Sequence, residues 1–312
     1  MMLIATFFRH TSIHSHIPRI SEMKTNKSSS DCFVANGSID VDIEDLVVTA
    51  KKDDVTVLGA VNNIETFSTT DGPGVRMLVF TQGCPKRCII CSNPETQCIS
   101  DPNLSPDIAM TDKEVADLLE EYGEFLKPNN GGVTLSGGEP MLQPEFSRAV
   151  FVRAHSLGLT TCLDTSGHGN PKTWDIVLPS TDYVMLCPKA MNPEVAAFIN
   201  GVSKEAAIRA QDMARFIRDN YKDIKLSIRW VLLKDLTDTS AEIDALIKFA
   251  KDLSPVLTHV ELLPYHTLGR EKYDSLGMPY MFDDVEPYKY SEAIRIKKYL
   301  ENAGVAVALA EE

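Results

Sequence analysis

The sequence predicts an α/β fold in which strands and helices alternate. From Val75 onward, short β-rich runs are each followed by a segment with apolar residues at helical spacing. This unit occurs six times, which implies parallel strands because each helix returns the chain to the same edge of a sheet. With 312 residues, 44% of them hydrophobic, the chain can bury a sizeable core.

Each of the six predicted units consists of one strand and one helix. In chain order they are Val75–Phe80 with Thr111–Leu126, Gly132–Ser136 with Pro144–Ser156, Thr160–Asp164 with Pro171–Leu178, Tyr183–Leu186 with Lys204–Tyr221, Lys225–Leu233 with Ala241–Leu253, and His259–Leu263 with Ser291–Ala303. Val305–Leu309 is a candidate for one more strand. Periodicity alone does not separate an open doubly wound sheet from a closed or partly closed barrel.

Unusual polar and glycine residues follow the carboxyl ends of these predicted strands. They are Gly83 and Cys84, Gly137 to Glu139, Asp164 and Thr165, Lys189, and His266. In barrel folds, residues at these positions converge on one mouth, where the chemistry takes place. This placement favours a barrel with its site at that mouth.

The N-terminal residues differ in composition from the rest of the chain. In the first thirty or so residues, four cations (Arg9, Arg19, Lys24 and Lys27) face the single acid Glu22 among many Ser, Thr and His residues. This composition fits an organellar transit peptide, which would direct the protein to a mitochondrion or plastid, or a disordered tail on a cytoplasmic protein. We predict a disordered extension over residues 1–57 and a barrel domain over residues 58–312.

Charge and cysteine content exclude several classes of protein. The net charge of −13, with no long run of Lys and Arg, argues against binding to nucleic acid or to an anionic membrane surface. No stretch approaches the roughly 18 apolar residues of a membrane-spanning helix, so we expect no membrane partner. Seven cysteines, three of them within eight residues, favour metal binding in a reducing compartment over a disulfide scaffold.

The clustered cysteines are Cys84, Cys88 and Cys91. Three thiolates can hold one iron–sulfur cubane with one iron left open, and soft thiolates suit iron–sulfur clusters and zinc alike. A zinc site needs a fourth ligand, and because no His lies between His16 and His155, only Cys98 is close by. A zinc-stabilised interaction protein is therefore the non-enzymatic alternative. Cys32 and Cys162 are expected to be inert small hydrophobes.

This cysteine spacing resembles the signature of the radical S-adenosylmethionine (radical SAM) superfamily, Cys-x3-Cys-x-aromatic-Cys. Ile90 stands where the family usually has the aromatic residue that contacts adenine. Apolar contact is retained with Ile90, but ring stacking is not.

Four further segments look like those of the pyruvate formate-lyase-activating enzymes, over about residue 58 to the C-terminus. They are Thr70–Arg76, Ser136–Pro140, Leu163–Gly167 and Glu261–His266. The resemblance implies a partial (β/α)6, TIM-like barrel, which agrees with the six units. The chain lacks the second set of cluster-binding cysteines found in activases of several other glycyl-radical enzymes, which favours the pyruvate formate-lyase branch.

The resemblance implies an activity and its partners. A [4Fe–4S] cluster on the three cysteines would bind S-adenosylmethionine and cleave it reductively. The resulting 5′-deoxyadenosyl radical would take hydrogen from a glycine Cα of pyruvate formate-lyase, leaving a glycyl radical. The electron would come from a donor such as flavodoxin or ferredoxin. An alternative enzyme is a radical SAM protein that acts on a small molecule, such as a deazaguanine-forming synthase.

The same resemblance suggests which residues contact S-adenosylmethionine. Gly137 and Gly138 carry no Cβ, so a ligand can approach their backbone, and Glu139 can accept from an ammonium group. The other candidates match family positions at the cofactor: Ile90, Ser92, Asn93, Asp164, Cys187, Pro188, Lys189 and His266.

Two further roles follow from the resemblance. Asp164, Thr165 and Met185 match positions that help hold a monovalent cation in the family. Cys187 takes the fourth position, where family members can have aspartate, and a thiol is a poor ligand for a hard cation. Asp71 matches a position near the bound glycyl peptide, although an Asp-Gly-Pro-Gly turn in which Asp71 caps its own backbone explains it equally well.

Overall fold

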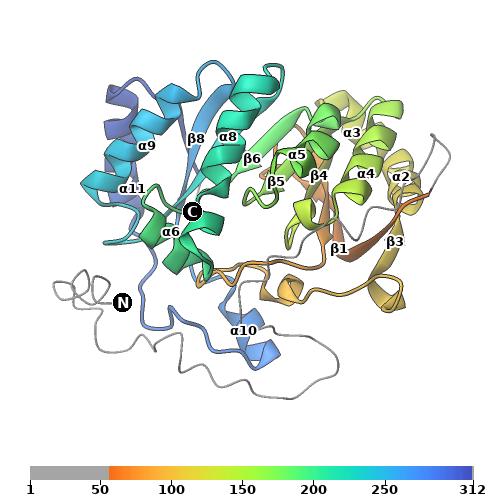
Figure 1. The fold of residues 1–312 in the computed structure, drawn as a ribbon, viewed down its shortest axis with the longest axis horizontal. Helices are drawn as coiled ribbons and strands as arrows, with labels where there is room; N and C mark the ends of the chain where they lie inside the picture. Colours follow the sequence, from red (N-terminus) through yellow and green to blue (C-terminus); the bar gives the residue numbers. More distant parts are fainter. Residues whose placement is uncertain (1–55, 311–312) are drawn as a thin grey trace.

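The computed structural model describes residues 56–310 and contains one mostly parallel sheet (Figure 1). The predicted N-terminal extension lies outside these residues except for Thr56 and Val57. The strands of the described part are β1 (Leu58–Ser68), β2 (Arg76–Thr81), β3 (Ala109–Thr111), β4 (Gly132–Gly137), β5 (Thr160–Thr165), β6 (Tyr183–Leu186), β7 (Lys225–Leu232), β8 (Leu257–Pro264) and β9 (Val307–Leu309).

The strand order is β3-β1-β2-β4-β5-β6-β7-β8-β9. From β2 to β9 every neighbouring pair is parallel, whereas β1 pairs antiparallel with both β2 and β3. Each parallel strand lies beside its predecessor in the sequence, as in a barrel, but no pairing in the described part joins β3 to β9. The predicted parallel α/β fold is confirmed, and its sheet is open between these two edge strands.

The helices lie mainly in a row along one side of the sheet, and α10 stands apart from the others (Figure 1). This is expected when successive crossovers have the same hand. The helices are α2 (Asp112–Glu121), α3 (Gly123–Leu126), α4 (Pro144–Ser156), α5 (Pro171–Val177), α6 (Pro193–Asn200), α7 (Lys204–Ala207), α8 (Arg209–Asn220), α9 (Ser240–Asp252), α10 (Arg270–Leu276) and α11 (Tyr290–Asn302).

Local sequence signals set several helix starts. Asn170 and Asn192 each accept hydrogen bonds from backbone N–H groups of the first turn, and a proline follows each of them. Thr111 forms a capping box with Glu114 ahead of α2. These signals explain why α5 and α6 begin one residue after an asparagine and α2 one residue after Thr111.

The structure differs from the predicted elements in several respects. The strands β1 and β3 and the helices α6 and α10 were not predicted. The predicted helix over residues 111–126 ends at Glu121, and α3 follows it after Tyr122. The predicted helix over residues 204–221 is likewise divided at Ile208 into α7 and α8. Short segments of this kind depend on tertiary partners more than on their own periodicity.

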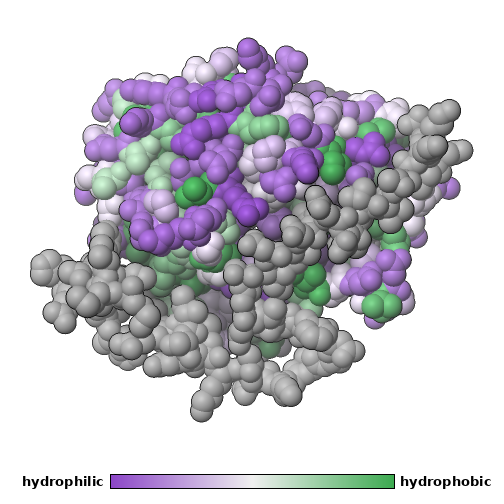
Figure 2. All heavy atoms as spheres, in the orientation of Figure 1, coloured by the Kyte–Doolittle hydropathy of each residue, from purple (hydrophilic) through white to green (hydrophobic). Residues whose placement is uncertain are grey.

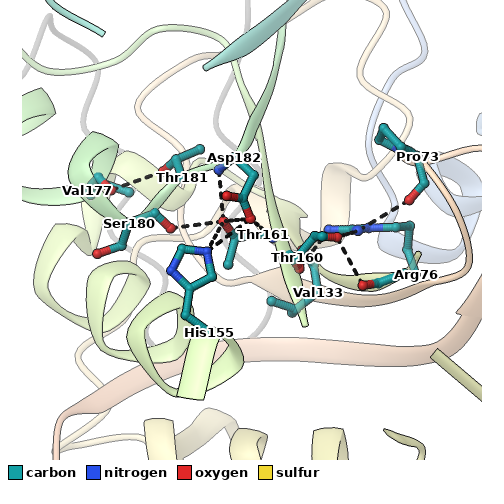
Figure 3. Close-up of polar contacts among 11 residues, drawn as sticks. Pro73, Arg76, Val133, His155, Thr160, Thr161, Val177, Ser180, Thr181 and Asp182 are labelled. Carbon is teal, nitrogen blue, oxygen red and sulfur yellow. Dashed lines mark hydrogen bonds and ion pairs between the residues drawn. The ribbon is translucent and has the colours of Figure 1, made fainter. Parts of the chain in front are cut away.

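Arg76 anchors the turn before β2 to the middle of the sheet. Its side chain is 0% exposed, and it donates to Pro73 O at 3.3 Å, Thr134 Oγ1 at 3.1 Å and Val133 O at 2.5 Å (Figure 3). Burial lowers the pKa of Arg76, but a guanidinium stays protonated in proteins. These bonds hold the Asp71–Gly74 turn against β4.

A cavity of about 430 Å³ lies at the amino ends of β5, β6 and β7, the edge opposite the predicted site. His155 and Asp182 line it, and His155 Nε2 lies 3.0 Å from Asp182 Oδ2 (Figure 3). Asp182 Oδ2 also accepts from Thr161 N at 2.8 Å. These contacts join α4, β5 and the start of β6, so the polar residues here are used for structure.

The face shown in Figure 2 carries mostly hydrophilic side chains with scattered apolar ones. The exposed apolar residues of the described part include Phe125, Val152 and Tyr299, which belong to three different helices. Singly exposed apolar side chains are normal for a protein surface. Within residues 56–310, no helix has the length and apolar character needed to cross a membrane.

Candidate active site

The candidate site lies at the carboxyl ends of the parallel strands. β2 leads to the cysteine loop, which we define as residues 84–91, β4 leads to Gly138 and Glu139, and β6 leads to Cys187. Parallel strands end at the same edge, so these loops are brought together there.

Backbone hydrogen bonds hold the start of the cysteine loop in place. Gly83 N donates to Thr96 O at 2.8 Å, and Glu139 N donates to Gly83 O at 2.9 Å. A Cβ atom on Gly138 would lie 2.2 Å from Gly83 O, so no larger residue fits there. The Gly137-Gly138 pair therefore allows the β4 loop to pack directly on the cysteine loop.

The other side of the cysteine loop packs on the end of α6 and on α10. Arg87 N donates to Asn200 O at 2.9 Å, and Ile89 N donates to Ile199 O at 3.0 Å. Tyr273 of α10 donates its hydroxyl to Cys91 O at 3.1 Å. The loop is thus held by segments more than a hundred residues away in the sequence.

Cys84, Cys88 and Cys91 are half-buried and carry free thiols. Burial raises the pKa of Cys84, and the nearby Cys88 and Glu139 raise it further. Burial also raises the pKa of Cys88, against the opposing effect of Lys189. Cys84 and Cys88 therefore favour the neutral thiol by themselves. Binding of a metal, whose charge favours the thiolate, would deprotonate the cysteines that hold it.

Lys189 supplies positive charge beside these thiols. Burial alone would lower its pKa, but the negative charges that Cys187 and Cys88 carry as thiolates raise it overall. Its backbone has φ 68, a left-handed conformation that is uncommon for a non-glycine residue and frequent at functional sites. The predicted residue Lys189 is thus placed at the cysteines, with its side chain paired to Cys187.

Lys86 and His168 also belong to the site, and sequence reasoning missed both. Lys86 is 3% exposed and donates to Ser166 O at 2.8 Å. Burial lowers the pKa of Lys86 and of His168, while Glu139 opposes this effect in both. The position of Lys86 between two of the clustered cysteines was the available signal. For His168, the only sequence signal was its place just after the Leu163–Gly167 segment.

Glu139 is 0% exposed and braces two loops. Its Oε1 accepts from Thr165 Oγ1 at 2.6 Å and from Met141 N at 3.2 Å, and its Oε2 accepts from Ser166 N at 2.9 Å and Ser166 Oγ at 2.5 Å. These four bonds fill the lone pairs of the carboxylate. The expected acceptance from an ammonium group therefore finds no free oxygen site in this structure.

The guanidinium of Arg229, on β7, lies close to three carboxylates. Its Nη1 lies 3.3 Å from Asp164 Oδ2 and 3.9 Å from Asp71 Oδ1, and its Nε lies 3.1 Å from Glu261 Oε2. Burial alone would lower the pKa of Arg229, but Asp164, Glu261 and Asp71 raise it overall. The structure therefore brings the predicted residues Asp71 and Asp164 to one guanidinium.

Asp71 also forms hydrogen bonds within and beside the turn that contains it. Its Oδ2 accepts from Ser68 Oγ at 2.7 Å and from Thr70 Oγ1 at 3.2 Å, and its carbonyl accepts from Thr134 Oγ1 at 2.7 Å. The Asp71 carboxylate thus bonds to hydroxyl groups of its own turn, and none of these bonds comes from a backbone N–H of the described residues. Its place near Arg229 leaves the peptide interpretation open.

Of the four residues predicted around a monovalent cation, Asp164 and Thr165 lie on β5, Met185 lies on the neighbouring β6, and Cys187 follows β6. Asp164 pairs with Met185 and Thr165 with Leu186 in the β5–β6 register, and Cys187 N donates to Thr165 O at 3.0 Å. The hydroxyl of Thr165 is already bonded to Glu139, and Asp164 Oδ2 accepts from Ser136 Oγ at 2.7 Å.

Of the remaining predicted cofactor residues, Ile90 belongs to the cysteine loop, and Ser92 and Asn93 follow it directly. Ile90 is partly buried against the core, Ser92 is exposed, and Pro188 is buried. Asn93 Oδ1 accepts from Lys272 Nζ of α10 at 2.8 Å. His266 is exposed at the start of the segment that leads to α10.

That segment reaches the cysteine loop through Gly269. A Cβ atom on Gly269 would lie 3.3 Å from Ser92 Cα and 3.6 Å from Cys91 O. The residues after β8 therefore lie beside the last cysteine of the loop.

Within residues 56–310, no three His, Cys, Asp or Glu side chains surround one point closely enough to hold a single metal ion. Thiolates that bind a cubane each contact a different iron, so they need not converge on one point.

Known proteins resemble this chain in sequence and in fold. Residues 78–250 match the model of the radical SAM superfamily. The chain is 36% identical over 255 residues to the pyruvate formate-lyase 1-activating enzyme of Escherichia coli (strain K12), which covers 80% of this chain and 98% of the relative. It is 34% identical over 244 residues to the pyruvate formate-lyase-activating enzyme of Clostridium pasteurianum, with 78% and 98% covered.

Two solved structures are similar in fold. A radical SAM methyltransferase from Sphaerobacter thermophilus has a TM-score of 0.51 at 16% identity, covering 84% of this chain and 75% of that chain. Streptococcus suis SuiB bound to the precursor peptide SuiA has a TM-score of 0.54 at 15% identity, covering 75% and 48%. At these identities the similarity bears on the fold alone.

Proposed function

We propose a function from the family to which the chain belongs: it is a member of the radical SAM superfamily and, within it, of the pyruvate formate-lyase-activating enzymes. In this proposal Cys84, Cys88 and Cys91 hold a [4Fe–4S] cluster, and S-adenosylmethionine binds beside it. When bound and reduced, these cofactors supply a 5′-deoxyadenosyl radical that takes hydrogen from a glycine Cα of pyruvate formate-lyase. The residues of the chain bind and orient these groups.

The observation that carries the proposal is the charge arrangement at the cysteine loop. Three thiols lie at the mouth of the sheet, with the cations Lys86 and Lys189 within electrostatic reach. Bound thiolates would place negative charge there, and buried negative charge needs compensation. The two lysines supply it, so the residues present fit the cluster.

The residues around the loop would orient S-adenosylmethionine. The backbone of Gly137 and Gly138 would contact the cofactor, and the absence of Cβ atoms lets this backbone pack on Phe80 and Gly83. Glu139 fixes the same backbone relative to Thr165 and Ser166. We assign Glu139 to positioning in place of direct acceptance, because its oxygens are occupied. The other proposed cofactor contacts are Ile90, Ser92, Asn93, Asp164, Cys187, Pro188, Lys189 and His266.

Asp71 would face the glycyl segment of the protein substrate. It lies in the turn before β2, and Arg229 connects it to Asp164 at the mouth of the sheet. Movement of this turn on substrate binding would therefore change the position of Arg229 and its contact with Asp164. A low-potential one-electron donor such as flavodoxin or ferredoxin is needed because the cleavage is reductive.

A monovalent cation near Asp164, Thr165 and Met185 remains part of the proposal. Cys187 would contribute little to it, because a hard cation prefers oxygen to sulfur.

Hydrogen transfer from a glycyl peptide tests the proposed function directly. The full-length protein is reconstituted anaerobically with iron and sulfide, then given dithionite, S-adenosylmethionine and a peptide that carries a Cα-deuterated glycine. We expect deuterium in 5′-deoxyadenosine. The control peptide has alanine in place of that glycine and should give none.

The alternatives give different results in the same assay. A radical SAM enzyme that acts on a small molecule would bind iron and sulfide and cleave S-adenosylmethionine, with no deuterium transferred from the peptide. A zinc-stabilised interaction protein would bind zinc without sulfide and give no cleavage.

A further inference from the structure

Asn200, the last residue of α6, has a buried side chain that faces the cysteine loop. It is 0% exposed, and the Cys88 thiol donates to its Oδ1 at 3.4 Å. Its Nδ2 is buried and has no hydrogen-bond partner in residues 56–310. A buried N–H group without a hydrogen bond is energetically unfavourable, so we expect Nδ2 of Asn200 to have an acceptor when the site is occupied.

The acceptor would be the Cys88 sulfur in the cluster-bound protein. A thiol carries a proton and donates to an amide oxygen, whereas an iron-bound thiolate has no proton and can only accept. The oxygen and nitrogen of an asparagine amide exchange places by a half-turn of the amide group, so Nδ2 can take the place that Oδ1 has here, 3.4 Å from the Cys88 sulfur. In the cluster-bound protein, Nδ2 turns toward Cys88.

The backbone keeps Asn200 beside Cys88. Arg87 N donates to Asn200 O and Ile89 N donates to Ile199 O, so the residues on both sides of Cys88 are bonded to the end of α6. Gly201 has φ 64, and a Cβ atom there would lie 2.6 Å from Arg87 O. This close packing holds the end of α6 against the cysteine loop.

We propose that Asn200 is a positioning residue that donates an N–H···S hydrogen bond to Cys88 and thereby raises the reduction potential of the cluster. The inference rests on the proposed function, because it requires the cluster. Reduction adds negative charge to a cluster and its thiolates, and a hydrogen bond to a ligand sulfur stabilises that charge. Asn200 would thus make the cluster easier to reduce.

The test compares the full-length protein with Asn200→Leu, which keeps the size of the side chain without its N–H, and with Asn200→Ala. The control is Asn192→Ala, which removes the cap at the other end of α6, where Asn192 Oδ1 accepts from Glu194 N at 2.8 Å. All forms are reconstituted, and iron and sulfide per chain are measured. The cluster potential is then measured by redox titration monitored by electron paramagnetic resonance, without S-adenosylmethionine.

We expect both Asn200 variants to hold the cluster at a more negative midpoint potential than the wild-type protein. A tenfold fall in the reduced-to-oxidised ratio at one applied potential corresponds to about 59 mV for a one-electron couple. The Fe–S stretching bands in resonance Raman spectra should also shift, because the bonded sulfur changes its charge. Asn192→Ala should match the wild-type protein in both measurements.

Three results would overturn the inference. One is an unchanged potential in cluster-loaded Asn200→Leu. Another is loss of the cluster from both Asn200 variants but not from Asn192→Ala, which would make Asn200 a structural requirement. A wild-type protein that binds no iron and sulfide would overturn the proposed function itself, and the inference with it.

Discussion

Arg229 Nη1 lies 3.3 Å from Asp164 Oδ2, which links β7 to β5 across β6. The same nitrogen lies 3.9 Å from Asp71 Oδ1, in the turn that precedes β2. One guanidinium therefore relates the proposed substrate-facing turn to a strand end at the site. Its charge balances carboxylates that are about four-fifths buried.

Removing this guanidinium should destabilise the fold. Arg229→Met keeps the length of the side chain but leaves the acids Asp71, Asp164 and Glu261 without their shared cation. We expect a loss of about 3 kcal/mol in the free energy of unfolding, measured by urea titration, which is the lower range for breaking a buried ion pair. Arg215→Met is the control, because Arg215 is 44% exposed in its ion pairs. It should cost about 1 kcal/mol or less. Equal losses in the two variants would contradict this account of Arg229.

Replacement of any one of the clustered cysteines should remove the cluster. Two thiolates are too few to hold a cubane that already has an open iron. We expect iron and sulfide contents near zero for Cys84→Ala, Cys88→Ala and Cys91→Ala after reconstitution. Cys162→Ala should bind iron and sulfide as the wild-type protein does, because Cys162 is buried in β5. Full iron content in Cys88→Ala would rule out the assignment.

Cys187→Asp should make cofactor cleavage more dependent on sodium or potassium. A carboxylate supplies the hard oxygen that a thiol cannot, at the residue whose backbone N–H donates to Thr165 O. The rate of 5′-deoxyadenosine formation is measured in sodium, potassium and tetramethylammonium buffers. Cys187→Ser, which adds no charge, should respond less. If the aspartate variant showed the wild-type cation response, the proposed cation site would lose its support.

Lys272 should affect binding of S-adenosylmethionine more than turnover. Its Nζ donates to Asn93 Oδ1 at 2.8 Å and to Glu95 Oε1 at 2.6 Å, so it fixes the residues that follow the cysteine loop. Losing about 1 kcal/mol of positioning in Lys272→Met would raise KM roughly fivefold with little change in kcat.

Lys297→Met is the control for Lys272→Met. It breaks the exposed pair of Lys297 with Glu301 on α11 and should leave both constants unchanged. A fall in kcat alone for Lys272→Met would argue against a role in cofactor binding.

Deleting residues 1–55 should leave the fold and iron binding intact, whereas deleting residues 1–60 should not. Val57 N donates to Asp112 Oδ1 at 2.7 Å, and Ala60 N donates to Gln143 Oε1 at 2.6 Å, so the longer deletion removes contacts to α2 and to the loop before α4. The measurements are the urea midpoint and the iron content. Similar stability for the two truncated proteins would mean that Val57 and the first three residues of β1 contribute little.

Residues 1–57, fused to a fluorescent protein, test the transit-peptide hypothesis separately. Import into a mitochondrion or plastid would support it. A cytosolic fusion would favour the tail interpretation.

Much of the fold could be predicted from the sequence, because it depends on local patterns. The helix over Pro144–Ser156 and the strand over Tyr183–Leu186 have the predicted bounds. The parallel order followed from the alternation of strands and helices. β1 could not be predicted in the same way, since its burial follows no regular alternation and its pairing with β2 and β3 is antiparallel.

The sequence by itself determined the cysteine spacing and the placement of glycines and polar residues after strand ends, because each depends on neighbours within a few residues. Tertiary structure alone decided how those residues are used. The carboxylate of Glu139 accepts hydrogen bonds from Thr165 and Ser166. The side chain of Asn200 accepts one from Cys88, which is 112 residues away in the sequence. No local sequence pattern predicts such contacts, because they form only when the sheet brings distant loops to one edge. Once buried there, each polar atom forms hydrogen bonds with the groups that lie nearest to it.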